Sequence, residues 1–94
     1  MYNERGDFKE LAQERLDTLS RDLALVGVRL SSEAVMADLR AQGYAGQAGH
    51  KQDTEWFLVS KPGTCLTVSR HGGAWRVTEI DRASYEWICE RLSH

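Results

Sequence analysis

Three short segments rich in β-branched and aromatic residues lie within residues 55–80, and they constrain the fold more than any other feature of the chain. The turns between them carry strong signals. Pro62-Gly63 suits the centre of a type II turn, and Gly72-Gly73 supplies the positive φ angles of a two-residue hairpin. Short segments between such turns are typical of strands that pair with their chain neighbours. The sequence therefore predicts a three-stranded antiparallel meander over residues 55–80.

The two turns also define which residues of the predicted strands lie opposite one another. Pairing Lys61 with Thr64 and His71 with Ala74 puts directly opposed side chains on the same face of the sheet. One face then collects large apolar side chains in a contiguous block, and we expect it to pack against helices as the core. Its members are Phe57, Val59, Leu66, Val68, Trp75 and Val77.

The opposite face of the predicted sheet combines a polar centre with apolar residues at its margins. The register puts Trp56 opposite Ser69 and Ser69 opposite Arg76, so that the guanidinium can stack across the indole ring. One interpretation has the long N-terminal helix covering this face, which makes Trp56 a core residue. The other leaves the face open, and a Trp beside an Arg is typical of protein-binding hot spots. The candidate partner-binding residues are Trp56, Leu58, Arg76 and Ile80.

The first 30 residues carry the stripe of a long amphipathic helix. Apolar side chains recur at intervals of three and four residues from Ala12 to Leu30, opposite a charged face, and Gly27 is a possible stop. A stripe of fewer than three heptads more often packs on its own domain, but pairing with a second copy of the chain stays open. The candidate residues for such a homodimer are Leu16, Leu19, Leu23 and Val26.

Shorter signals complete the expected order of elements. Ser31 or Ser32 offers an N-cap to a second helix, and Asp81 offers one to a C-terminal helix. The Gly-rich polar stretch ahead of the meander predicts a loop. We expect a single α+β domain over residues 1–94 in the order ααβββα. Its parts are a long helix at 1–30, a second helix at 31–43, a Gly-rich loop at 44–54, the meander at 55–80 and a C-terminal helix at 81–93.

The residues that could carry chemistry do not fall into a known catalytic or metal-binding spacing. Cys65 and Cys89 have no C-x-x-C partner and are expected as free thiols, and the histidines lack metal-ligand spacing. The glycines at 43–49 match neither the P-loop nor the dinucleotide fingerprint, and Asp53 and Glu55 are expected to be solvent-exposed. We therefore expect a protein that is not an enzyme and that uses no metal or cofactor.

The near-neutral charge narrows the class of partner. Lys and Arg number 12 against 14 Asp and Glu, a net charge of -2, whereas a nucleic-acid binder usually carries a basic surplus. The αβββα order of residues 31–94 is similar to that of double-stranded RNA-binding domains. That family carries a basic cluster at the start of its last helix, where this chain reads Asp-Arg-Ala-Ser at 81–84. The polar N-terminus and the lack of a long apolar stretch predict a cytoplasmic chain without a membrane span.

These observations favour a small non-enzymatic protein-interaction module that binds a larger protein as an inhibitor or accessory factor. Phage-encoded inhibitors of bacterial defence systems, anti-CRISPR proteins among them, and bacterial immunity proteins are compact single-domain proteins of this kind. The alternative is a dimeric nucleic-acid-binding protein that uses Lys51, Lys61, Arg70 and Arg76. A small enzyme is the third hypothesis.

Overall fold

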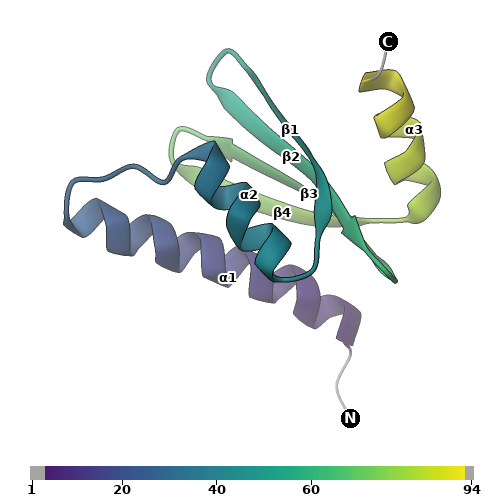
Figure 1. Ribbon diagram of the computed structural model, residues 1–94, viewed down its shortest axis with the longest axis horizontal. Helices are drawn as coiled ribbons and strands as arrows, with labels where there is room; N and C mark the ends of the chain where they lie inside the picture. Colours follow the sequence, from purple (N-terminus) through teal and green to yellow (C-terminus); the bar gives the residue numbers. More distant parts are fainter. Residues whose placement is uncertain (1–3, 93–94) are drawn as a thin grey trace.

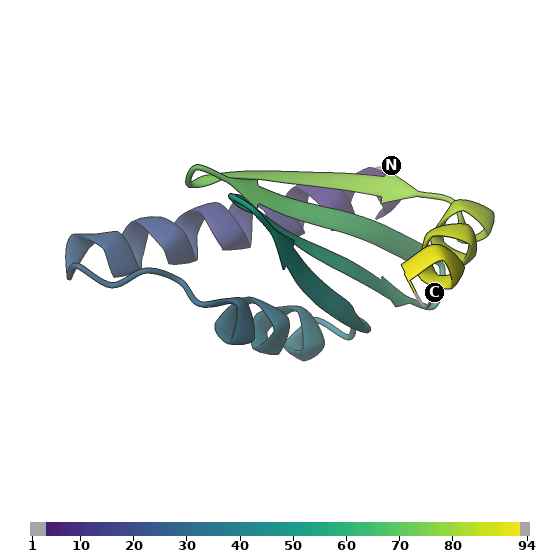
Figure 2. The ribbon, with the colours of Figure 1, turned by 90° about the horizontal axis from the view of Figure 1, so that it is seen from above.

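The computed structural model describes the backbone of residues 4–92 and the side chains of residues 8–92. An antiparallel sheet of four strands carries two helices on one side and a third on the other (Figures 1 and 2). The outermost residues of the two predicted terminal helices, 1–3 and 93, lie outside the described residues. The expected α+β class is confirmed. The elements are α1 (Glu4–Leu25), α2 (Ser32–Ala41), β1 (Ala45–Lys51), β2 (Thr54–Lys61), β3 (Thr64–His71), β4 (Ala74–Ile80) and α3 (Arg82–Leu92).

The predicted loop at residues 44–54 is wrong, because most of it forms strand β1, and the meander has four strands instead of three. β1 pairs antiparallel with β2 along its whole length, from Ala45 opposite Ser60 to Lys51 opposite Thr54. The strands lie in chain order across the sheet, β1-β2-β3-β4. The observed order of elements is therefore ααββββα.

The glycines that suggested a loop are required by the close packing of β1 on its neighbour. A Cβ atom at Gly46 would lie 1.9 Å from the carbonyl oxygen of Leu58, and one at Gly49 would lie 2.0 Å from the ring of Trp56. Glycine weakens an isolated strand, but it allows a neighbouring backbone or side chain to approach closely. The Gly-rich polar composition therefore predicted a loop where the chain forms a tightly packed strand.

The predicted register of the other three strands is confirmed. Lys61 lies opposite Thr64 and His71 opposite Ala74. The glycines of both turns have positive φ angles, as the predicted turn types require. Because one register runs through the whole meander, the predicted division of side chains between the two faces holds as well.

α1 and α2 pack on the sheet face predicted to be the core. α1 runs beside β4, and α2 lies over β1 and β2 (Figures 1 and 2). Between them the rings of Phe57 and Trp75 lie with their centroids 6.2 Å apart. Removing this apolar surface from water is the main force that holds the layers together. The buried core cluster is Ala12, Leu16, Leu30, Val35, Met36, Leu39, Tyr44, Phe57, Val59, Leu66, Val68, Trp75 and Val77.

The predicted stop at Gly27 is confirmed, and α1 ends at Leu25 instead of residue 30. Gly27 has a φ of 76°. Its N–H donates to the carbonyl of Ala24 at 3.0 Å, and the N–H of Val28 donates to the carbonyl of Leu23 at 2.9 Å. These two bonds satisfy carbonyls that the helix end would otherwise leave unpaired, and they need a left-handed residue, which favours glycine.

The other two helices begin at the caps expected from the sequence. The hydroxyl of Ser31 accepts from the N–H of Ala34 at 3.1 Å, and the carboxylate of Asp81 accepts from the N–H of Ser84 at 2.7 Å. α2 stops two residues before the predicted boundary, because Gly43 with a φ of 98° repeats the left-handed ending of α1.

Candidate protein-binding face of the sheet

The sheet face opposite the core, called here the second face, is only partly covered. α1 lies on the core face, so the interpretation in which it covers Trp56 is wrong. α3 is the helix on this side, and it packs against β3 (Figures 1 and 2). Leu58 and Cys65 beneath α3 are 2% and 4% exposed. The second face is therefore divided into a half closed by α3 and an open half toward the other end of the strands.

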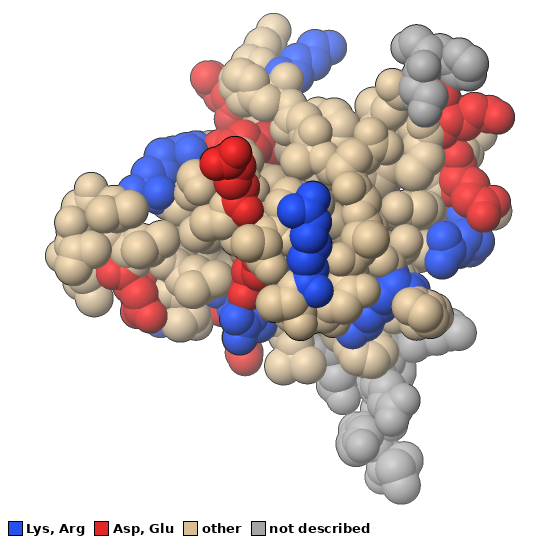
Figure 3. Space-filling view, viewed as in Figure 1, with Lys and Arg blue, Asp and Glu red and all other residues tan. Residues whose placement is uncertain are grey.

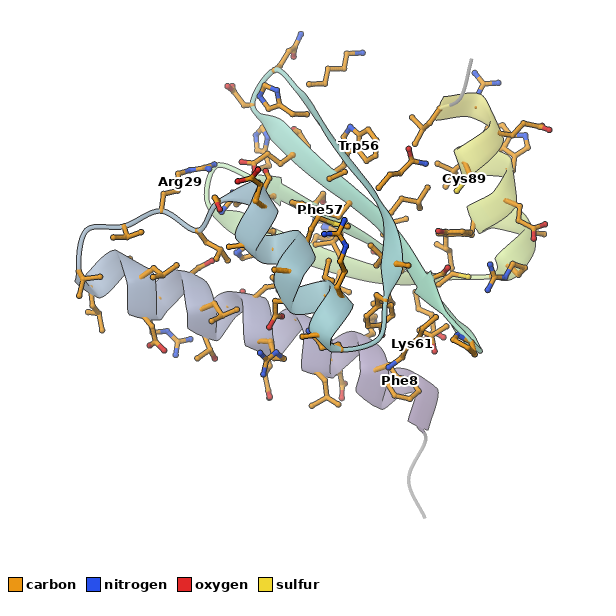
Figure 4. The ribbon with its side chains drawn as sticks, in the orientation of Figure 1. Phe8, Arg29, Trp56, Phe57, Lys61 and Cys89 are labelled. Carbon is orange, nitrogen blue, oxygen red and sulfur yellow. The ribbon has the colours of Figure 1, made fainter. Side chains whose placement is uncertain are left out.

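The open half carries the predicted row of Trp56, Ser69 and Arg76 on three adjacent strands. Trp56 and Ser69 are partly exposed and Arg76 is exposed. Figure 4 shows Trp56 pointing to the side of α3 while its neighbour Phe57 points toward α2. The row therefore exists as predicted, on a surface of mostly small and uncharged side chains.

The predicted stacking of the Arg76 guanidinium on the Trp56 ring is wrong. The indole turns the other way, toward β1, where a Cβ atom at Gly49 would lie 2.0 Å from the ring. Because Gly49 has no side chain, the Trp56 ring can lie directly over it, and an aromatic side chain over a cross-strand glycine also protects the backbone there. The Trp56 ring therefore packs on Gly49, and the residue is partly exposed to solvent.

The four predicted partner-binding residues do not share one surface. Trp56 and Arg76 lie on the open half, whereas Leu58 is buried under α3 and is out of reach of a partner in this fold. Ile80 is partly buried and lines a hollow at the start of α3, together with Cys65 and other residues. Burial raises the pKa of the Cys65 thiol, so this thiol stays protonated at neutral pH.

Most residues of the predicted dimerisation stripe pack into the core of their own chain. Leu16 is fully buried, and Leu19 and Leu23 pack against the same cluster. Val26, in contrast, is 72% exposed beside Leu25 at the end of α1. Figure 3 shows uncharged side chains at this end of the molecule, with basic and acidic groups interspersed elsewhere on the visible face. Of the four predicted residues, Leu16 is fully buried, Leu19 and Leu23 are partly buried, and only Val26 is exposed.

A buried ionic cluster ties the α1–α2 linker to the strands, and the expectation that Glu55 is solvent-exposed is wrong. Arg70 donates to the Glu55 carboxylate at 2.7 and 3.2 Å, Arg29 at 2.5 Å and the hydroxyl of Ser32 at 2.7 Å. We call these four residues the Glu55 cluster. A sequence signal was present, because the same strand register puts Glu55 opposite Arg70.

Aromatic packing extends the Glu55 cluster to α1. The guanidinium of Arg70 lies 4.5 Å from the ring centroid of Trp75, a cation–π contact. The indole N–H of Trp75 in turn donates to the hydroxyl of Ser20 at 2.7 Å. The charged group of Arg70 is therefore paired on one side and stacked on the other, which is how a buried arginine is retained.

The Glu55 carboxylate is fully ionised near neutral pH. Hydrogen bonds from Arg70, Arg29 and Ser32 lower its pKa from 4.5 to about 2 against the opposing effect of burial. It lines a hollow of about 460 Å³ that also holds His50, His71 and Asp53 at the ends of the hairpins. A carboxylate with so low a pKa is a weak base near neutral pH, which does not suit the role of a general base.

The stability of the fold is expected to depend on pH through the ionisation of Glu55. Because the pKa of Glu55 is lower in the folded state, its ionised form stabilises the fold above about pH 4.5, and that stabilisation is lost as the pH falls toward 2. We expect the wild-type Tm to exceed that of Glu55→Gln by a margin that shrinks over this range. Thermal melts of both proteins at several pH values test this, and a constant margin would contradict it.

The cations of the alternative nucleic-acid hypothesis are not assembled into one patch. Arg70 is buried in the Glu55 cluster. Lys61 lies 4.0 Å from the ring centroid of Phe8 and 4.7 Å from that of Tyr44, on the side of the helices (Figure 4). Arg76 is on the second face, and Lys51 is at the tip of the first hairpin. These four positive charges do not line up along one surface that a nucleic-acid backbone could follow.

Comparison with protein-family models, with curated proteins and with solved structures found no match for this chain. In residues 8–92 no three His, Cys, Asp and Glu side chains converge as a metal ion requires. None of the helices over residues 4–92 combines the length and apolar character needed to cross a bilayer.

Proposed function

We propose that this chain is a small non-enzymatic protein-interaction module that binds a larger protein through the open half of the second face. In this role it acts as an inhibitor or accessory factor of the phage anti-defence or immunity-protein class. The observation that carries the proposal is the partly exposed ring of Trp56, which packs on Gly49 on a largely uncharged surface. Arg76, two strands away across Ser69, adds an exposed cation on the same face.

The physical support lies in what such a residue contributes to binding. Trp and Arg are enriched among the few residues that dominate protein interfaces, where they bury a large area. The ring of Trp56 is already packed on Gly49 before any partner arrives. An anchor ordered in advance loses little conformational entropy on binding. The Ser and Thr side chains around it are uncharged, and removing water from them costs less free energy than removing it from charged groups.

Site-specific photo-crosslinking tests the proposal in the native host. A photo-reactive amino acid at Ser69 lies on the open half, and one at Ala37 lies on the exposed side of α2 as a matched control. We expect the probe at Ser69 to capture a larger protein that the probe at Ala37 does not capture. With that protein purified, Trp56→Ala should raise Kd by about thirtyfold, the loss of one hot-spot side chain.

Thr78→Ala is the matched control for affinity, because Thr78 is exposed on the same face. We expect this change to leave Kd nearly unaltered, and circular dichroism should show that both variants are folded. Equal binding by Trp56→Ala and wild type would contradict the proposal. Salt-dependent retardation of nucleic acid by the wild type, lost in Arg76→Glu, would favour the alternative instead.

A further inference from the structure

The two edges of the sheet differ in whether another element covers their outward-facing backbone groups. At the β4 edge, the side chain of Gln13 from α1 behaves like a neighbouring strand. Its amide nitrogen donates to the carbonyl of Trp75 at 3.1 Å, and its oxygen accepts from the N–H of Val77 at 3.1 Å. These are the groups that an incoming strand would need, so α1 closes this edge (Figure 1).

The β1 edge is open. Every residue of β1 except the partly buried Gly49 is exposed, and no hydrogen bond among the described residues reaches its outer side. Natural sheets usually protect such an edge with proline, a bulge or several charges. β1 has the sequence Ala-Gly-Gln-Ala-Gly-His-Lys, with its one formal charge at the end, Lys51. The edge is therefore built to accept a strand.

The hairpin geometry defines which residues offer their backbone groups outward. The turn between β1 and β2 has two residues and closes on the pair Lys51 and Thr54. In such a hairpin the closing pair is hydrogen-bonded, and bonded pairs alternate along the ladder. The residues between those pairs point their N–H and C=O groups away from β2. These residues are Gly46, Ala48 and His50.

We propose that β1 pairs antiparallel with β1 of a second copy of this chain, with the two-fold axis at Ala48. In that register each larger side chain meets a small one: Gln47 meets Gly49 of the second copy, and His50 meets Gly46. Lys51 meets Ala45, so like charges are never opposed. Each outward-facing residue exchanges a pair of hydrogen bonds, and the two sheets become one. This self-complementarity selects a second copy over an unrelated peptide.

The arrangement is separate from the proposed partner surface. The side chains of Ala48 and His50 point to the core side of the sheet, because these residues lie opposite Phe57 and Glu55. Trp56 belongs to the other face. Variants at Ala48 therefore probe self-association without altering the open half of the second face.

Charge placed at Ala48 gives a sharp test, because it is the one strand position that would face its own copy. We expect the wild type to reach twice its 10.6 kDa mass in size-exclusion chromatography with light scattering as concentration rises. Ala48→Glu and Ala48→Lys should each weaken the dimer by about tenfold or more, because like charges are opposed. Ala48→Gln, of matched size, should retain it, and a mixture of the Glu and Lys variants should form a heterodimer.

Thermal melts show whether the monomers are intact, and similar Tm values for the three variants are expected because Ala48 is exposed. A wild type that stays at 10.6 kDa at the highest concentration reached would overturn the proposal. It would also be overturned by equal dimerisation of the Glu and Gln variants, or by a dimer that only Val26→Glu at the end of α1 disrupts. Failure of the partner-binding experiment leaves these outcomes unaffected.

Discussion

Replacing Glu55 by Ala is expected to lower the free energy of unfolding by about 3–5 kcal/mol, the typical cost of removing one partner of a buried ion pair. The reason is that Arg70, which is 4% exposed, would keep its charge without the carboxylate that now accepts two of its hydrogen bonds. Arg29 and Ser32 would lose the same acceptor. Urea unfolding followed by circular dichroism measures the effect.

Two further variants test whether the loss of stability comes from leaving a buried charge without a partner. Asp38→Ala removes a carboxylate that is 9% exposed, about as little as Glu55, but the arginine that it leaves unpaired, Arg15, is half exposed and stays hydrated, so this change should cost less than Glu55→Ala. The double change Glu55→Leu with Arg70→Met should recover much of the stability, because no buried charge then lacks a partner. Similar losses for Asp38→Ala and Glu55→Ala would contradict the expectation that leaving the buried Arg70 unpaired costs more than leaving the exposed Arg15 unpaired.

Truncating Leu16 to Ala should destabilise the chain by about 2–5 kcal/mol, the usual range for a buried leucine. Leu16 is fully buried between α1 and the sheet. Val26→Ala on the same stripe should change stability by about 0.5 kcal/mol or less, because Val26 is 72% exposed. The same urea titration, repeated at several protein concentrations, compares the two.

This pair also decides between the two uses of the α1 stripe foreseen from the sequence. If α1 packs on its own domain, the loss in Leu16→Ala is independent of protein concentration. A loss that grows on dilution would mean that Leu16 is buried against a second copy instead. Equal effects of the two truncations would likewise contradict the observed packing.

The strand register was predictable from the sequence because it depends on local chemistry. Pro62-Gly63 and the two glycines after His71 admit few turn conformations, and each turn sets which residues lie opposite. The caps at Ser31 and Asp81 are local in the same sense, since each side chain bonds to an N–H three residues later. The row of Trp56, Ser69 and Arg76 followed from that register.

The candidate site itself was only half predictable. Which helix covers the second face is a question of packing between distant segments, and the apolar stripes of α1 and α3 were both compatible with covering it. Leu58 therefore looked like a contact residue and is buried, while the ring of Trp56 turned toward β1 instead of toward Arg76. No local pattern specifies these choices.

What the sequence by itself determined is the meander of residues 55–80, its two faces and the capped starts of α2 and α3, because turns and caps act over a few residues. Only the tertiary structure decided that the Gly-rich stretch is a strand, since Gly46 and Gly49 are strand residues only when Leu58 and Trp56 lie against them. It also decided that one sheet edge is closed by α1 and the other is open. Those outcomes depend on contacts between residues far apart in the chain, whose free energies appear only when the layers pack.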